Sequence, residues 1–158
     1  MNMQMFKGNW DREYVKNHPD CLFIFTDNTN RNSGKKKIDP NSWYAKKYGI
    51  HKHYPGITSA CIRGLDNAYP ISTQHYYTKK KKGINGRWED KDFNEFKTVI
   101  YDEINDIVDA WRTGKYKVVY TPDGGFFNRS ISNISKERTP NLYWYLMDKL
   151  TFIYKQIE

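Results

Sequence analysis

The stretch Cys21-Leu-Phe-Ile-Phe-Thr26 is followed directly by Asp27-Asn-Thr-Asn-Arg-Asn-Ser-Gly34. The first six residues are almost all apolar, aromatic or β-branched, which is typical of a strand covered on both faces. The next eight are mostly the short polar residues that form turns. A buried strand running into a polar loop is a recurring unit of α/β folds, whose ligands bind at the carboxyl ends of strands.

Two further segments repeat this pattern, Ala68-Tyr-Pro-Ile-Ser-Thr73 and Lys117-Val-Val-Tyr-Thr121. Pro70 argues against a central position for the first of them, because proline has no N–H to donate to a neighbouring strand. Residues Ile57 to Ile62 are also expected to form a strand.

The clearest helix is expected over Asp92 to Arg112. Asp92 and Glu95 have the spacing of a reciprocal N-terminal cap, and Gly114 stands where a left-handed residue ends a helix. One stripe at helical spacing collects the apolar side chains of this segment, namely Phe93, Phe96, Ile100, Ile104, Ile107, Val108 and Trp111.

Two more helices are expected, one over Asn41 to Tyr48 and one beginning at Thr139-Pro140, where a capping hydroxyl precedes proline. Strands that alternate with helices predict a three-layer α/β fold, a mixed sheet flanked by helices on both faces. The 158 residues show no repeat and no linker, so residues 1–158 are expected to form a single domain.

Composition narrows the class of protein. An aromatic content of 16% argues against disorder. Neither an apolar run of the roughly 20 residues that span a bilayer nor a signal peptide is present, so a cytoplasmic protein without a membrane partner is expected. Cys21 and Cys61 are expected as free thiols. His51 and His53 lack a third ligand at suitable spacing, so no metal is expected. No cofactor is expected either.

The charge balance points to an anionic partner. Lys and Arg together number 26 against 18 Asp and Glu, which gives a net charge of +8. Both a nucleic acid and a smaller polyanion such as a nucleotide fit this surplus. Two lysine runs, Lys35 to Lys37 and Lys79 to Lys82, stand beside loops that follow the expected strands.

Polar or glycine-bearing segments follow each of the three strands, and the carboxyl ends of parallel strands meet at one edge of a sheet. Gln74-His75 follows the second strand, and Pro122-Asp-Gly-Gly125 follows the third. Paired glycines let the backbone approach a ligand closely, and successive N–H groups there can form an anion-binding nest.

The order of these elements resembles a macro domain, particularly the subgroup that includes the terminal ADP-ribose glycohydrolase. A group of small, mostly phage and bacterial proteins with a Phe-x-Phe-Gly-Asp-Asn opening is also similar. The resemblance covers roughly Asp20 to Leu150. Its motifs stand here as Phe23-Ile-Phe-Thr-Asp-Asn28 leading to Gly34, Tyr44-Ala-Lys-Lys-Tyr-Gly49, Ala68-Tyr-Pro-Ile-Ser-Thr-Gln74 and Thr121-Pro-Asp-Gly-Gly-Phe-Phe127.

The resemblance implies binding of ADP-ribose or a related NAD-derived nucleotide. It places Asn28, Asn30, Ser33 and Gly34 near the distal ribose. It also implies that one segment wraps the diphosphate and that one of the two phenylalanines in it stacks on a ring. This segment contains Asp123, Gly124, Gly125, Phe126 and Phe127.

The chain departs from the glycohydrolase at two positions. The family's lysine after the second strand and its aspartate after the glycine loop match Gln74 and Asn128 here, and neither amide can act as a nucleophile or general base. Candidates for a rebuilt site are carboxylates that position water, a histidine, and guanidinium groups that hold phosphate. These residues are Asp27, Asp123, His75, Arg31 and Arg129.

The leading hypothesis is therefore a macro-like domain that binds an ADP-ribose-type nucleotide or ADP-ribosyl modification, with hydrolysis as the candidate reaction. A phage counter-defence protein in the host cytoplasm would suit this composition. The alternative is a basic module that binds single-stranded nucleic acid through lysines and exposed aromatic side chains.

Overall fold

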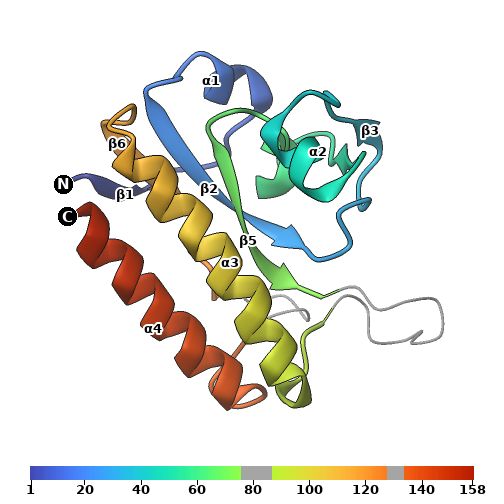
Figure 1. Ribbon diagram of the computed structural model, residues 1–158, viewed down its shortest axis with the longest axis vertical. Helices are drawn as coiled ribbons and strands as arrows, with labels where there is room; N and C mark the ends of the chain where they lie inside the picture. The colour runs from blue at the N-terminus through green and yellow to red at the C-terminus, as the bar shows by residue number, and fades with distance from the viewer. Residues whose placement is uncertain (76–86, 128–133) are drawn as a thin grey trace.

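The computed structural model describes residues 1–75, 87–127 and 134–158 of the chain (Figure 1). Its central sheet has four parallel strands in the order β1-β6-β2-β5. The strands are β1 (Met3–Met5), β6 (Val118–Thr121), β2 (Cys21–Asn28) and β5 (Ala68–Gln74). A separate antiparallel pair is formed by β3 (Lys36–Lys37) and β4 (Lys52–His53).

Helices cover both faces of the central sheet. The long helices α3 (Phe93–Arg112) and α4 (Pro140–Ile157) lie side by side on one face (Figure 1). The other face is covered by α1 (Arg12–Lys16), α2 (Trp43–Tyr48) and the 3-10 helix η1 (Ser59–Ile62). The prediction of a three-layer α/β arrangement is confirmed at this level.

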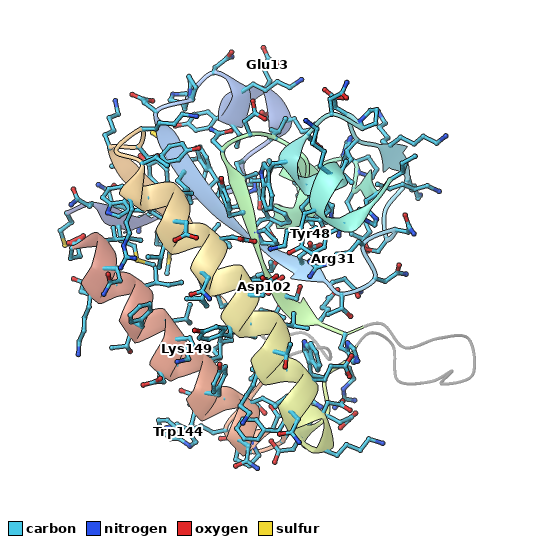
Figure 2. All side chains as sticks on the ribbon, in the orientation of Figure 1. Glu13, Arg31, Tyr48, Asp102, Trp144 and Lys149 are labelled. Carbon is cyan, nitrogen blue, oxygen red and sulfur yellow. The ribbon has the colours of Figure 1, made fainter. Side chains whose placement is uncertain are left out.

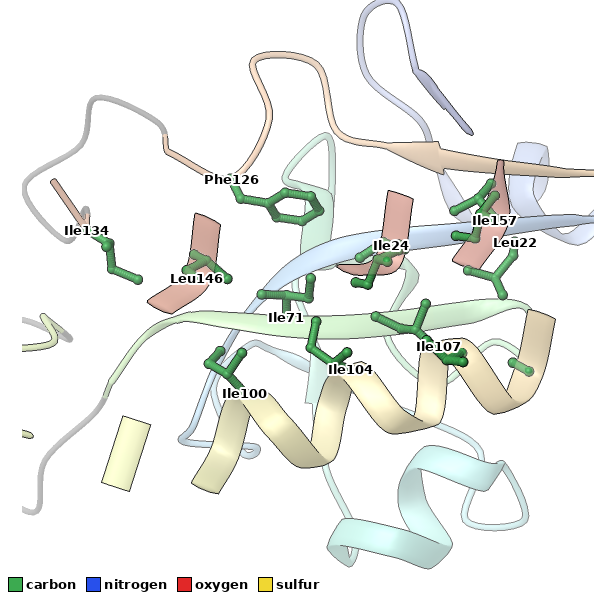
Figure 3. Close-up of a cluster of buried hydrophobic side chains, with 14 of the residues drawn as sticks. Leu22, Ile24, Ile71, Ile100, Ile104, Ile107, Phe126, Ile134, Leu146 and Ile157 are labelled. Atoms are coloured by element: carbon green, nitrogen blue, oxygen red, sulfur yellow. The ribbon is translucent and has the colours of Figure 1, made fainter. Parts of the chain in front are cut away.

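Strand β2 separates two apolar cores, because its side chains alternate between the faces of the sheet. Leu22 and Ile24 pack into the core beneath α3 and α4, which Figure 3 shows. Phe23 and Phe25 pack into the core beneath α2 and η1. The strand is therefore buried on both sides, as its near-continuous apolar sequence predicts.

The three expected strands all form, and the position of Pro70 is explained. Among the described residues, β5 pairs only with β2 and lies at an edge of the sheet, where a missing N–H is tolerated. The expectation of a mixed sheet is wrong for these four strands, which all pair in parallel. The antiparallel pair β3 and β4 stands apart from them.

The strand expected over 57–62 is wrong. Ser59 to Ile62 form η1 instead, and the Ser59 hydroxyl accepts a hydrogen bond from the backbone N–H of Thr26 at 3.1 Å. Strand β1 and helix α1 were not expected, since both are too short to give a periodic signal.

The helix ends differ in detail from their predicted caps. Asp92 is the N-cap residue of α3, but its side chain makes no capping hydrogen bond to that helix. The reciprocal cap instead joins Glu89 and Asp92 on the preceding 3-10 turn η3 (Asp90–Asp92). The Thr139 hydroxyl bonds the backbone of Ser135 rather than that of α4. Gly114 does follow α3 in the left-handed region. Among the described residues, every helix is too short or too polar to cross a bilayer.

Helix α3 provides a direct test of the core under the sheet. Ile104 is 2% exposed, so Ile104→Ala should lower the free energy of unfolding by about 2–5 kcal/mol in urea titrations. Tyr101 lies on the same helix and is 57% exposed, so Tyr101→Ala should change it by only about 0.5 kcal/mol. Equal losses in the two variants would contradict this packing.

Candidate functional site

A crevice opens where β2 and β6 separate. These strands pair only through Cys21–Phe23 and Val118–Tyr120. Beyond that point the chain leaves β2 toward the α2 face of the sheet and leaves β6 toward the α4 face. Adjacent parallel strands whose connections leave to opposite faces form the topological switch point at which α/β folds bind ligands.

Two adjoining cavities make up this crevice, with volumes of about 370 Å³ and about 290 Å³. Thr26, Thr58, Ser59 and Gln74 line both of them. The larger cavity is also lined by Gly8, Asn9, Trp10, Ile57, Pro122, Asp123 and Gly125. The smaller one is also lined by Asp27, Asn28, Tyr54 and Ala60.

Ser59 fixes one wall of the crevice. Its hydroxyl accepts the Thr26 N–H and lies within hydrogen-bond distance of the Thr26 hydroxyl, at a position where β2 still pairs with β5 but no longer with β6. The Ser59 carbonyl accepts the indole N–H of Trp10 at 3.0 Å. None of the wall residues Trp10, Thr58 and Ser59 was predicted, although Thr58-Ser59 before an apolar run is a helix-start signal.

The loop after β6 forms the opposite wall. The exposed Asp123 carboxylate accepts the backbone N–H of Gly8 at 3.0 Å and so joins this loop to the one after β1. Gly124 and Gly125 have φ of +83° and +73°, a conformation that favours glycine. A Cβ at Gly125 would meet nothing within 4 Å, so the backbone there is open to a ligand.

Among the described lining residues there is no lysine and no arginine. A bound anion would therefore be held by backbone N–H, hydroxyl and side-chain amide groups. The basic segment Lys35 to Lys37 does not line the crevice, and Lys79 to Lys82 lie outside the described residues.

Asp27 borders the smaller cavity, but its side chain has no exposed surface. Its carboxylate accepts hydrogen bonds from the guanidinium groups of Arg63 and Arg31 and from the Tyr44 hydroxyl. A carboxylate with three donors in a buried cluster is a structural anchor. The structure thus places this candidate catalytic group away from open solvent.

The same cluster extends to α3 through Glu103. Arg31 donates to Glu103 at 3.2 Å, and the Ser72 N–H and hydroxyl donate to it at 2.8 and 2.7 Å. Burial raises the pKa of Glu103 to about 7, although Arg31 and Ser72 oppose the shift. Figure 2 shows Arg31 beside Tyr48, whose ring centre lies 4.1 Å from the guanidinium carbon.

Asn28 and Gln74 meet at the floor of the crevice. The register of β2 and β5 shifts after Asp27, so that Asn28 lies opposite Gln74 rather than Thr73. The Asn28 amide donates to Gln74 Oε1 at 3.4 Å, and Asn28 Oδ1 accepts the Asn30 N–H at 2.9 Å. Such irregularities in strand pairing often redirect side chains next to functional sites.

Four other predicted ligand residues, Asn30, Arg31, Ser33 and Gly34, do not line the crevice. Arg31 is held between Asp27 and Glu103, and the Ser33 hydroxyl accepts from Arg63 at 3.1 Å. Gly34 lies against the backbone of His53. The loop after β2 therefore turns away from the crevice toward the β3–β4 pair.

His75 does not line the crevice either. Its ring stacks on Trp88 with centroids 3.9 Å apart, and Nδ1 lies 2.7 Å from the Thr29 hydroxyl. Phe126 belongs to the core beneath α4, whereas Phe127 is half-buried against Tyr143. The candidates Asn128 and Arg129 lie outside the described residues.

In the described parts of the chain, no group of His, Cys, Asp and Glu side chains could hold a metal ion. His51 and His53 have their pKa lowered by burial, and their Nδ1 atoms contact Asn32 and the Tyr54 carbonyl. Cys21 and Cys61 are buried free thiols, as expected.

A family model described as "Family of unknown function (DUF7831)" matches residues 5–149. The chain belongs to this family. The match takes in both walls of the crevice and the whole buried cluster around Arg63. No curated protein and no solved structure matches the chain.

The raised pKa of Glu103 makes stability depend on pH in a defined direction. The folded protein holds a proton between pH 4.5 and about 7 that the unfolded chain has released, so the stabilisation is full below this window and is lost as pH rises through it. Relative to Glu103→Gln, the native free energy of unfolding should fall by at most about 1.4 kcal/mol per pH unit across the window.

Urea titrations of both proteins over this range measure the difference. Glu13→Gln, on the exposed surface of α1, is the matched control. Its plot of unfolding free energy against pH should run parallel to that of the native protein. A parallel profile for Glu103→Gln as well would show that Glu103 does not titrate in this way.

Proposed function

We propose that the crevice binds an ADP-ribose-type nucleotide, or an ADP-ribosyl group on a larger molecule, within a macro-like arrangement of the sheet. The observation that carries the proposal is the turn at Gly124 and Gly125, which lies at the switch point with open space above its backbone. The Gly125 N–H closes this turn on the Pro122 carbonyl at 2.9 Å, so what the turn offers a phosphate is close approach to the backbone without any cationic side chain.

The polar lining suits the sugar and phosphate part of such a ligand. Hydroxyl groups of Thr26, Thr58 and Ser59 and the amide of Gln74 surround both cavities. Ribose hydroxyls and phosphate oxygens both bond to such neutral groups. The volumes of about 370 and 290 Å³ are together within the range of small-molecule sites, roughly 300 to 1,000 Å³.

An apolar groove continues from the crevice across Gly125 and suits the base. Gly125 lines both the crevice and this groove, which has a volume of about 370 Å³. Its other walls are mainly apolar, with Met3, Phe127, Leu150 and Tyr154 among them. A ligand with a polar centre and a flat aromatic end, such as an adenine nucleotide, matches this division.

Titration calorimetry with ADP-ribose, its cyclic isomers, NAD and a nucleotide without a nicotinamide ribose tests the proposal. We expect heat with ADP-ribose and at least a tenfold loss of affinity in Gly125→Val, whose side chain would occupy the space above the turn. Gly114→Val is the matched control, because Gly114 has a similar φ of +77° and lies beyond α3, away from the crevice.

The proposal would be overturned if none of these nucleotides gave heat. Equal losses in the two glycine variants would show that backbone strain, and not the crevice, governs binding.

Hydrolysis of the bound ADP-ribosyl group is tested separately, and Asp123 is the residue to substitute. It is the exposed carboxylate of the described crevice lining, and a carboxylate can position and activate water. Products released from an ADP-ribosylated peptide are measured by mass spectrometry. We expect Asp123→Asn to abolish them, while turnover that persists in this variant would exclude Asp123. A native protein that binds ADP-ribose and releases nothing is a binder alone.

A further inference from the structure

The β3–β4 pair carries an exposed cluster of lysines that the crevice does not use. Lys35, Lys36 and Lys37 are exposed, and Lys52 on the opposite strand is half-buried. We call these four residues the lysine ribbon. Figure 1 shows β3 at the rim of the molecule beside α2, and Figure 2 shows nitrogen-tipped side chains projecting outward there.

The ribbon holds positive charge without compensation. Over residues 1–75, 87–127 and 134–158, no carboxylate forms an ion pair with any of its four ammonium groups. Lys37 and Lys52 are direct cross-strand partners. Like charges placed opposite each other destabilise a strand pair, so the fold alone gives no reason for this arrangement.

The backbone beneath these lysines is held firmly. The Lys35 N–H bonds the His53 carbonyl at 3.0 Å, and the Ile38 N–H bonds the His51 carbonyl at 3.1 Å. The buried Arg63 guanidinium donates to the carbonyls of Ser33 and Lys52, one on each side of the pair. The lysines are therefore presented on a preformed support, which reduces the ordering that binding would require.

A glycine allows this close support. Gly34 has φ of +121°, and a Cβ there would lie 2.7 Å from the backbone carbon and oxygen of His53. Only a residue without a side chain brings the chain into Lys35 this close to β4.

We propose that the lysine ribbon is a contact surface for the phosphate backbone of a nucleic acid, separate from the crevice. Lysines act on phosphates as point charges, and each phosphate contact releases counterions from the strand. The exposed positions of β3 and of the residue before it are all lysine, and Ile38 beyond them is buried. The surface is mainly charge, although the exposed Ile50 stands two residues before Lys52. Such a surface suits a phosphate backbone better than a lipid bilayer, which takes up several apolar side chains.

Fluorescence anisotropy with a mixed-sequence single-stranded DNA and its duplex tests the surface. We expect native binding that weakens steeply between roughly 50 and 200 mM salt. Replacing all four lysines by glutamine should weaken binding at least tenfold at low salt. It should also flatten the plot of log affinity against log salt by about 0.7 for each lysine that contacts a phosphate of the single strand.

A control variant removes the same charge elsewhere. Glutamine at the exposed positions Lys16, Lys91, Lys115 and Lys155 should have less effect than glutamine in the ribbon. Arginine at the four ribbon positions keeps the charge and should keep binding. Circular dichroism confirms that each variant is folded.

Three outcomes would overturn the proposal. They are equal losses in the ribbon and control variants, no salt-dependent binding by the native protein, and binding to phosphatidylserine vesicles but not to DNA. Calorimetry with ADP-ribose on the ribbon variant should still give heat, with at most the modest loss of affinity that slower arrival of an anion causes, so a failure of the nucleotide proposal is recognised independently of this one.

Discussion

The buried contact between Arg63 and Asp27 connects more of this structure than any other polar interaction described above. Arg63 follows η1, and Asp27 lies near the end of β2. From this one guanidinium, hydrogen bonds reach the end of the central strand, the loop after it and β4. A buried charge needs such satisfaction, because desolvation of an unpaired ion is strongly unfavourable.

This contact also determines which residues remain for chemistry. Asp27 and Arg31 would be natural choices for a catalytic acid and a phosphate ligand, yet both are used to balance charge inside the protein. The crevice is left with hydroxyls, amides, turn glycines and Asp123. Asp27 and Arg31 thus maintain the fold, whereas contact with a ligand is left to other residues that line the crevice.

The sequence predicts the frame of the fold better than the content of the crevice. Phe23 and Ile24 reveal a strand buried on both faces, and Ile100 and Ile104 reveal the amphipathic α3, because burial leaves a periodic pattern. Asp123 and Gly125 were found because turn glycines after a strand are visible locally. Ser59 and Arg63 were missed because their roles depend on contacts with residues more than 30 positions away.

The separation between the lysine ribbon and the crevice has a kinetic consequence. An uncompensated positive surface attracts anions over distances near the Debye length, about 10 Å at moderate salt, without touching them in the final complex. Such a surface changes how often an anionic ligand arrives, whereas neutral groups around Thr26 and Gly125 would determine how long it stays. The rates of arrival and departure at the crevice would then respond differently to ionic strength.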